Sequence, residues 1–393
     1  MKVLFLTPRF PFPPVKGDQA VPYFRLKELG RRHEITLLTF YEKDEDLANL
    51  PELQPYCREI RAVKLPRWKS YANMLLLGLF SRLPLQALYF RSAAYRRELA
   101  ALLSGGGFEV VHAFMLRMLP YAGDIKLPKV LELIDSMGLN MGRRAATEGP
   151  LTRWLFEWEA RRAGRYEAAA PGLADSVIVV SAKDKASIPG DNVRVVPLGV
   201  DTAAFKPAPV PCAEPVIVFT GNMGYAPNVA AAGWFADNCF EAVRASSPGA
   251  RYVIAGARPA PSIRALASRE GITVTGPVDS MPAVLASSAV AVAPMQSGSG
   301  MQFKILEAMA CGLPVVTTNL GLGDIKAVPG EHLLVADSPE EFSAAVLRLL
   351  GDPAGRARLG AAARAFIEAR HSWRGAALAV ESAYPLGKAG GVK

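Results

Sequence analysis

Short runs of Val, Ile and Leu alternate with longer amphipathic stretches along nearly the whole chain. Apolar runs bounded by turn residues predict buried strands, and apolar residues three or four positions apart predict helices. The predicted strands are 3–7, 34–39, 109–112, 129–134 and 176–180, then 216–220, 251–255, 272–275, 289–293, 315–318 and 333–335. The predicted helices are 19–31, 95–103, 151–170, 228–245, 261–270, 301–310 and 340–350.

This alternation predicts an α/β fold in which helices cover both faces of parallel sheets. The pattern stops over residues 198–215, which contain four prolines, and then restarts. Such a segment is a natural linker. We therefore expect two Rossmann-like domains, one over residues 1–190 and one over 191–370, facing each other across a cleft. Residues 371–393 would form a terminal segment.

Composition narrows the class of partner. The chain has 393 residues, half of them hydrophobic, and a net charge of +9, which favours acidic ligands such as nucleotide diphosphates, anionic lipid head groups or nucleic acid. Nucleic acid is disfavoured because no zinc-finger spacing, RNP-like motif or dense basic helix is present. The four scattered cysteines argue against a metal site or disulfide framework and favour the cytoplasm. No apolar stretch is long enough for a transmembrane helix.

Residues 289–318 are the most informative segment. They predict a buried strand, a Gly-rich loop, a short helix that stops at Gly312, and a second buried strand. Gly298 and Gly300 would let the backbone approach a ligand, and the free N–H groups of the helix start would suit a diphosphate. Lys304 adds a positive charge, and Glu307 is placed to bind ribose hydroxyls. The alternative is an ordinary strand-to-helix turn with a solvated Lys–Glu pair.

Two other loops follow predicted strands and contain glycine. Gly221 and Asn222 come after the strand 216–220, and the alternative is a plain turn in which Asn228 caps the next helix. Gly17 and Asp18 close a proline-rich loop after the first strand, with Asp18 as the expected N-cap of a helix. Backbone atoms in both loops could approach a ligand's phosphates.

Two side chains at the ends of predicted strands are candidates for acid–base chemistry. Asp135 could orient a sugar hydroxyl or help to deprotonate an acceptor, or it could cap a turn. His112 ends another strand, and a lone histidine on an apolar strand is more often a satisfied core residue. A plain NAD-dependent dehydrogenase is disfavoured, because no GxGxxG motif follows the first strand.

The run Gly-Ser-Gly-Met-Gln-Phe-Lys-Ile-Leu-Glu-Ala resembles the donor-binding motif of GT-B glycosyltransferases of family 4, which has two glutamates separated by seven residues. Glu307 matches the second glutamate, which holds the ribose in that family, and Ser299 replaces the first. The resemblance implies a donor site made of Ser297, Gly298, Ser299, Gly300, Met301, Gln302, Lys304 and Glu307. Residues 219–228 and 196–206 extend it, and this variant is similar to a subgroup associated with exopolysaccharide synthesis.

The resemblance implies a GT-B fold whose terminal helix, over 373–384, crosses back to the first domain. It implies transfer of a hexose from a nucleotide-diphosphate sugar to a saccharide or lipid-linked acceptor, with retention and without a metal or other cofactor. Asp44-Glu-Asp46 matches a metal-binding DxD pattern but is expected to be a solvated helix start. A GT-B sugar-nucleotide epimerase or phosphorylase, or a noncatalytic nucleotide-sugar-binding protein, remain alternatives.

Residues 71–90 are rich in apolar side chains and follow a basic stretch made of Arg61, Lys64, Arg67 and Lys69. A basic rim beside exposed apolar residues would suit peripheral docking at the inner face of a membrane, where a lipid-linked acceptor is reached. The alternative is a core helix or cleft wall with solvated flanks.

Overall fold

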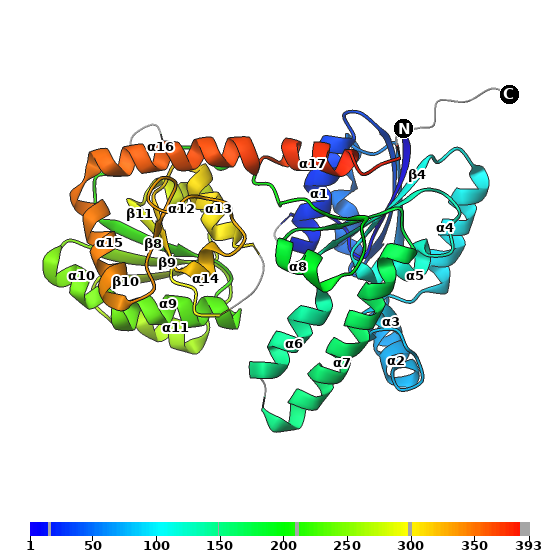
Figure 1. The fold of residues 1–393 in the computed structure, drawn as a ribbon, viewed down its shortest axis with the longest axis horizontal. Helices are drawn as coiled ribbons and strands as arrows, with labels where there is room; N and C mark the ends of the chain where they lie inside the picture. Colours follow the sequence, from blue (N-terminus) through cyan, green and yellow to red (C-terminus); the bar gives the residue numbers. More distant parts are fainter. Residues whose placement is uncertain (15–16, 148, 209–211, 298–300, 386–393) are drawn as a thin grey trace. The chain divides into compact units, whose positions relative to one another are not determined.

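The computed structural model describes residues 1–14, 17–147, 149–208, 212–297 and 301–385 (Figure 1). The chain divides into two compact units. The first unit contains Met1–Leu198 together with Trp373–Lys393, and the second contains Gly199–Ser372.

Within its described residues, the first unit has a seven-stranded parallel sheet in the order β3-β2-β1-β4-β5-β6-β7. Its strands are β1 (Lys2–Thr7), β2 (Glu34–Tyr41), β3 (Glu59–Lys64), β4 (Val110–Phe114), β5 (Lys129–Ile134), β6 (Ser176–Val179) and β7 (Val193–Val195). Its helices are α1 (Gly17–Leu29), η1 (Asp44–Glu52), α2 (Arg67–Gly78), α3 (Leu85–Tyr89), α4 (Ala93–Gly105), η2 (Leu116–Met118), α5 (Leu119–Ala122), α6 (Met137–Thr147), α7 (Pro150–Ala169), η3 (Ala170–Gly172), α8 (Ala182–Ser187) and α17 (Trp373–Glu381).

The described part of the second unit has a six-stranded parallel sheet in the order β10-β9-β8-β11-β12-β13. Its strands are β8 (Val216–Thr220), β9 (Arg251–Ala255), β10 (Ile272–Gly276), β11 (Val290–Ala293), β12 (Val315–Thr317) and β13 (Leu334–Val335). Its helices are α9 (Ala226–Asn238), α10 (Phe240–Ser246), α11 (Pro261–Leu266), α12 (Met281–Ala286), α13 (Phe303–Ala310), α14 (Asn319–Leu322), α15 (Pro339–Gly351) and α16 (Pro353–Arg370).

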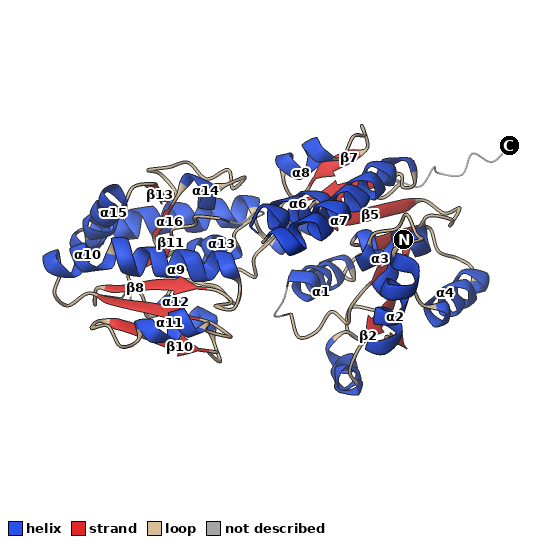
Figure 2. Cartoon of the chain, turned by 90° about the horizontal axis from the view of Figure 1, so that it is seen from below, coloured by secondary structure: helices blue, strands red, loops and turns tan. Residues whose placement is uncertain are grey.

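Helices cover both faces of each sheet. In the second unit, residues of α9, α10 and α15 form one buried cluster with β8, and residues of α12 and α13 form another on the opposite face. Figure 2 shows helices beside the strands of both units. The central strands are continuous apolar runs with both faces buried; β8 is buried at all five positions and β4 likewise. Burial of this kind is the property that distinguishes parallel strands from half-exposed antiparallel ones. The predicted α/β fold class with two Rossmann-like domains is confirmed.

Both sheets have a point at which the strand order reverses. In the first unit β1 lies between β2 and β4, and in the second unit β8 lies between β9 and β11. The chain therefore leaves β1 and β4, or β8 and β11, in opposite directions, which opens a crevice at the carboxyl ends of these strands. This position is where doubly wound sheets bind ligands. Each unit thus has one candidate site that topology alone specifies.

The C-terminal helix α17 packs on α1 of the first unit, as the resemblance implied. Trp373 stacks on Phe24 with ring centroids 4.9 Å apart, and the Glu381 carboxylate lies 3.1 Å from Arg32 and 3.2 Å from His33. Beyond the helix, the Tyr384 side chain is buried. Residues 373–384 therefore contribute to the core of the unit that contains the first strand.

The structure corrects several local expectations. α1 begins at Gly17, so Asp18 lies in the first turn rather than at the N-cap. Residues 228–245 form two helices that break at Cys239, and Tyr225, not Asn228, is the N-cap of the first. No helix in the described part of the chain combines the length and apolarity needed to cross a bilayer.

Candidate functional site

The reversal point of the second unit is formed by two loops, each of which leads into a helix. The loop after β8 contains Gly221 and Asn222 and enters α9, while the loop after β11 enters α13. α13 begins at Phe303, so Lys304 lies in its first turn and Glu307 one turn later. Within the described residues no side chain caps this helix start. Its first N–H groups therefore point toward the loop without the usual capping partner.

The Lys304 ammonium group is held inside the site rather than in bulk water. Its Nζ donates to Gln302 Oε1 at 2.7 Å and lies 3.7 Å from the sulfur of Met295. It is also 5.7 Å from the ring centroid of Phe219, at the end of β8. Burial lowers the pKa of Lys304 to about 8, although the charge of Glu307 opposes this shift. The ammonium group has lost much of its hydration, and the contacts that replace this water are weak.

The Glu307 carboxyl is perturbed in the opposite direction. Burial raises its pKa to about 7, and Lys304 lowers it only in part. Among the described residues its oxygens accept no hydrogen bond, although the residue is half-buried. A carboxyl group and an amine whose pKa values approach each other, at the carboxyl edge of a sheet, are the kind of groups that a ligand completes.

The loop after β8 is closed by its own side chains. Asn222 Oδ1 accepts from the Gly224 N–H at 3.0 Å, and the buried Asn228 donates through Nδ2 to the Asn222 carbonyl at 3.0 Å. A Cβ on Gly221 would lie 2.7 Å from Asn228 Nδ2, so glycine is required there. Asn222 and Tyr225 are exposed at the rim. These hydrogen bonds fix the conformation of the loop beside α13.

Arg258 is a candidate that the sequence analysis missed. Arg258 lies in the loop after β9, and its side chain is exposed. Its φ is +58°, a left-handed backbone conformation that residues other than glycine rarely adopt. Its Cβ faces Gly224, where an added Cβ would come within 3.3 Å. Among the described residues its guanidinium makes no hydrogen bond or ion pair. Backbone strain at a sheet's carboxyl edge is a recurrent sign of a binding residue.

The other predicted donor residues lie between β11 and α13. Ser297 is exposed at the end of the loop after β11, and Met301 and Gln302 are half-buried just before α13. Gly298, Ser299 and Gly300 lie outside the described residues. The structure therefore brings Gly221, Asn222, Lys304 and Glu307 to one reversal point, and the glycine loop that joins them to Ser297 stays a prediction.

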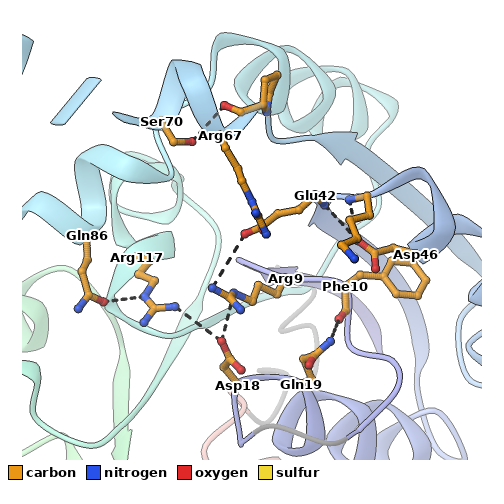
Figure 3. A network of polar contacts seen from close by, with 12 residues as sticks. Arg9, Phe10, Asp18, Gln19, Glu42, Asp46, Arg67, Ser70, Gln86 and Arg117 are labelled. Atoms are coloured by element: carbon orange, nitrogen blue, oxygen red, sulfur yellow. Dashed lines mark hydrogen bonds and ion pairs between the residues drawn. The ribbon is translucent and has the colours of Figure 1, made fainter. Parts of the chain in front are cut away.

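The reversal point of the first unit is crossed by an ion-pair network (Figure 3). Asp18, in the first turn of α1, lies 3.2 Å from Arg9 Nε and 3.9 Å from a terminal nitrogen of Arg117. Arg9 follows β1, Arg117 follows β4, and Arg9 also reaches Glu42, after β2, at 3.9 Å. Gly17 is exposed beside this network, with open space where a Cβ would lie. Both arginines retain donors for a polar ligand.

Asp135 lies at the carboxyl end of β5 in the same unit. Burial raises its pKa, as does the nearby Asp184, while a hydrogen bond from Asn140 Nδ2 lowers it. The residue before it, Ile134, has φ at +73°, and Met115 at the end of the neighbouring β4 has φ at +71°. Two residues with strained backbone conformations at adjacent strand ends mark this edge as a candidate site.

His112 lies in the core. Its side chain is fully buried, stacks on Phe5, and bonds Tyr384 at 2.8 Å through Nδ1 and Glu132 at 3.2 Å through Nε2. Burial lowers its pKa, so a neutral ring that donates to Glu132 and accepts from Tyr384 fits both bonds. This geometry favours the structural alternative, and a catalytic role stays a prediction.

In the part of the chain that the structure describes, no group of three or more His, Cys, Asp and Glu side chains could hold a metal ion. Asp44 and Asp46 begin the 3-10 helix η1, where Asp46 accepts from the Glu42 and Lys43 N–H groups.

Residues 214–352 match a protein-family model described as "Glycosyl transferases group 1". Over 75 residues the chain is 40% identical to a curated protein of Corynebacterium glutamicum, a GDP-mannose-dependent monoacylated alpha-(1-6)-phosphatidylinositol monomannoside mannosyltransferase. This match covers 19% of the chain and 20% of that protein. The chain thus spans about a fifth of the length of this curated relative.

Solved structures match over nearly the whole length. Sucrose-phosphate synthase from Thermosynechococcus elongatus superposes with a TM-score of 0.70 at 17% identity, covering 98% of both chains. HepE of Anabaena in complex with UDP gives 0.67 at 14% identity, covering 97% of this chain and 99% of that one. A glycosyltransferase from Rickettsia africae gives 0.65 at 12%, covering 98% and 97%. These similarities identify the fold as GT-B.

Proposed function

We propose that this chain, in which residues 214–352 are a group 1 glycosyl transferase domain within a GT-B fold, transfers a hexose from a nucleotide-diphosphate sugar to a hydroxyl group of a saccharide or lipid-linked acceptor. The observation that carries the proposal is the Lys304–Glu307 pair. Both groups lie at the reversal point of the second sheet, and burial shifts the pKa values of both toward neutrality.

In this proposal the diphosphate binds at the start of α13. The uncapped N–H groups of the helix and its positive dipole end would face the phosphates, with Lys304 supplying a full charge. Glu307, one turn further along, would accept hydrogen bonds from the ribose hydroxyls. Arg258 would add a guanidinium from the loop after β9, because Asn222 in the loop after β8 and Asn228 in α9 offer no positive charge.

The transfer breaks the bond between the sugar's anomeric carbon and the phosphate oxygen, and the electron pair leaves with the diphosphate. The acceptor oxygen forms the new bond and loses its proton. Because negative charge develops on the leaving group, preorganised amides and a cation are the larger catalytic contribution. We propose that the configuration is retained, that no metal or other cofactor is needed, and that the product enters polysaccharide or glycoconjugate synthesis.

The acceptor is assigned to the first unit. Arg9, Asp18 and Arg117 offer hydrogen-bond donors and acceptors at its reversal point, and Asp135 lies at the adjacent strand end. A carboxyl group whose pKa is raised by burial can hold a sugar hydroxyl or take its proton. Gly17 would let an acceptor or phosphate approach the backbone.

The test is a donor panel. A thermal-shift screen with UDP-, GDP- and ADP-sugars should show one donor that raises the melting temperature, because a ligand that binds only the folded state stabilises it. The named relatives suggest UDP-glucose and GDP-mannose as first members. With that donor, release of nucleotide diphosphate should depend on an added acceptor.

The outcomes separate the alternatives. Donor binding without release of nucleotide would indicate a noncatalytic binder, and conversion of one sugar nucleotide to another would indicate an epimerase. No stabilisation by any donor would contradict the proposal. Glu307→Gln should reduce the shift, while the matched surface variant Glu340→Gln, at the exposed first turn of α15, should retain it.

A further inference from the structure

One helix of the first unit exposes a continuous apolar surface. α2 and the turn after it present six large side chains whose exposed fractions lie between 56% and 89%: Trp68, Tyr71, Leu75, Leu76, Leu79 and Phe80. These six are called the α2 surface below. Only Ser70 and Gly78 of this helix are buried. Positions 68, 71, 75 and 79 recur at helical spacing, so the side chains lie along one face. Patches of this kind mark interaction sites.

Hydrogen bonds to neighbouring elements of the first unit hold α2 and the segment after it in place. The Arg162 guanidinium, on α7, donates to the Gly78 carbonyl at 2.9 Å and to that of Ser81 at 2.8 Å. Glu159 accepts from the Leu85 N–H at 2.6 Å, and Asn73 donates to the Arg91 carbonyl at 2.9 Å. Figure 1 shows α2 beside α3 at the outer edge of the unit. The exposure therefore belongs to an anchored helix rather than to a frayed segment.

The stretch of chain around the α2 surface is rich in basic residues, of which Arg61, Lys64 and Arg67 are paired with Glu59, Asp44 and Glu42. Residues 60–97 contain eight Lys or Arg and no Asp or Glu. Lys69 lies 5.2 Å from the Trp68 ring centroid. Arg82 and Arg91 are exposed, and within the described residues their side chains make no hydrogen bond or ion pair. These cations are free to meet an anionic partner.

We propose that the α2 surface docks the protein on a lipid bilayer that contains anionic head groups. Trp and Tyr prefer the head-group level of a membrane, aliphatic side chains enter the acyl boundary, and Lys and Arg gain from anionic lipids. A helix of 12 residues is about 18 Å long, too short for a hydrocarbon core of about 30 Å, so it would lie on the membrane.

A second copy of the chain is a poorer occupant. A symmetric dimer through this surface would place the same patch against itself. Lys69, Arg82 and Arg91 of both copies would then be brought together, and among the described residues no acidic side chain is paired with any of these three. Anionic lipid removes this repulsion and supplies the apolar phase at once. The inference goes beyond the proposed transfer activity and does not require it.

The experiment is co-sedimentation of the full chain with vesicles of phosphatidylcholine alone or of phosphatidylcholine with phosphatidylglycerol. Binding is expected with the anionic vesicles, and it should weaken as salt screens the charges. The double variant Leu75→Glu with Leu79→Glu should bind at least about tenfold more weakly, because two exposed apolar side chains no longer enter the bilayer. Arg82→Glu with Arg91→Glu should lose only the preference for anionic lipid.

The control is Leu173→Glu, which changes an exposed leucine in the turn after η3 and should bind vesicles as the unchanged protein does. Each variant should keep its melting temperature, because the substituted side chains are exposed. The proposal is overturned if the unchanged protein stays in the supernatant, or if the leucine variant sediments equally well. It is also overturned if analytical ultracentrifugation shows a dimer that the leucine variant breaks, since the surface is then an interface between copies.

Discussion

Each unit of this protein buries a charged group beside the centre of its sheet, and the two groups are satisfied to very different degrees. In the first unit Glu132 accepts from Arg25 Nε at 3.1 Å and from a terminal nitrogen at 2.9 Å, and it contacts His112 at 3.2 Å. Burial alone would raise the pKa of Glu132, but Arg25 and His112 bring it down to about 2. In the second unit, among the described residues, Lys304 donates to Gln302 and lies near the Met295 sulfur, and Glu307 accepts no hydrogen bond.

The difference separates a structural group from a binding group. The Arg25–Glu132–His112 network ties α1, β4 and β5 together, and its charges are stabilised within the fold. The Lys304–Glu307 pair sits at a strand-order reversal with pKa values of about 8 and about 7. A diphosphate and a ribose would supply the hydrogen-bond and ion-pair partners that this pair lacks among the described residues. Buried charge thus indicates function only where the protein itself leaves the charge incompletely paired.

The largest expected effect is the loss of stability when the Arg25–Glu132–His112 network is broken. Arg25→Met keeps the length of the side chain but leaves Glu132 buried without its cation. The free energy of unfolding of the first unit should fall by about 3–5 kcal/mol, as when one partner of a buried pair is removed. Chemical denaturation followed by circular dichroism measures this.

The control for Arg25→Met lies in the turn just after the same helix. Arg31 pairs with Glu28 at 2.6 Å, but the Arg31 side chain is 60% exposed. Arg31→Met should therefore cost no more than about 1 kcal/mol, the usual range for a surface ion pair. Equal losses for the two variants would show that burial does not distinguish these pairs.

The next largest effect is expected on donor affinity, when the Lys304–Glu307 pair is changed. Glu307→Gln removes a charged acceptor, so donor affinity should fall by a factor of about 10–100, which corresponds to about 1.5–3 kcal/mol for a charged hydrogen bond. The melting temperature without donor should stay the same or rise, because a buried carboxyl with few partners is lost. Calorimetric titration against Glu340→Gln as control measures the change. A loss of stability with unchanged affinity would make Glu307 a structural residue like Glu132.

The amino-acid pattern predicts the central strands well and the edges poorly. β5, β8 and β9 have the predicted bounds, because each is an apolar run between Pro, Gly or charged residues. β3 was missed because Val63 is its only buried residue and its sequence does not contain an apolar run. α16 was missed because its Ala, Arg and Gly residues give weak helical periodicity.

The candidate site was predictable where local sequence determines it. A Gly-rich loop before a helix fixes the positions of Lys304 and Glu307 relative to the helix start, whatever the rest of the chain does. Arg258 was not predictable, because sequence does not reveal which non-glycine residue adopts a positive φ. The Arg25–Glu132 pair joins residues 107 positions apart, but the glutamate within an otherwise apolar strand was a usable signal of a buried partner.

A smaller effect is expected at Arg258. Arg258→Ala should weaken donor binding by about 3–10-fold, because the guanidinium is exposed and part of its attraction is screened by water. Arg258→Gly should weaken binding as much while raising the melting temperature, since glycine adopts a φ of +58° without strain. Arg264→Ala, at an exposed position of α11, is the control and should change neither quantity. Unchanged affinity in both Arg258 variants would remove this residue from the site.

The smallest effect is the pH dependence of donor binding, and it tests the comparison most directly. If binding needs the Glu307 carboxylate, affinity falls as the pH drops through about 7, where this group takes up a proton. If binding also needs the Lys304 ammonium, affinity falls again as the pH rises through about 8, where that group loses its proton. Affinity should therefore peak between these values and change by at most about tenfold per pH unit on either side. An intact nucleotide sugar is the ligand for this titration, because its diphosphate does not itself titrate in this range. Glu307→Gln should remove the acidic limb and keep the alkaline one. A flat profile, or an acidic limb that persists in Glu307→Gln, would mean that Glu307 does not contact the donor as a carboxylate, and the contrast with Glu132, which stays ionised down to a pH of about 2, would lose its functional meaning.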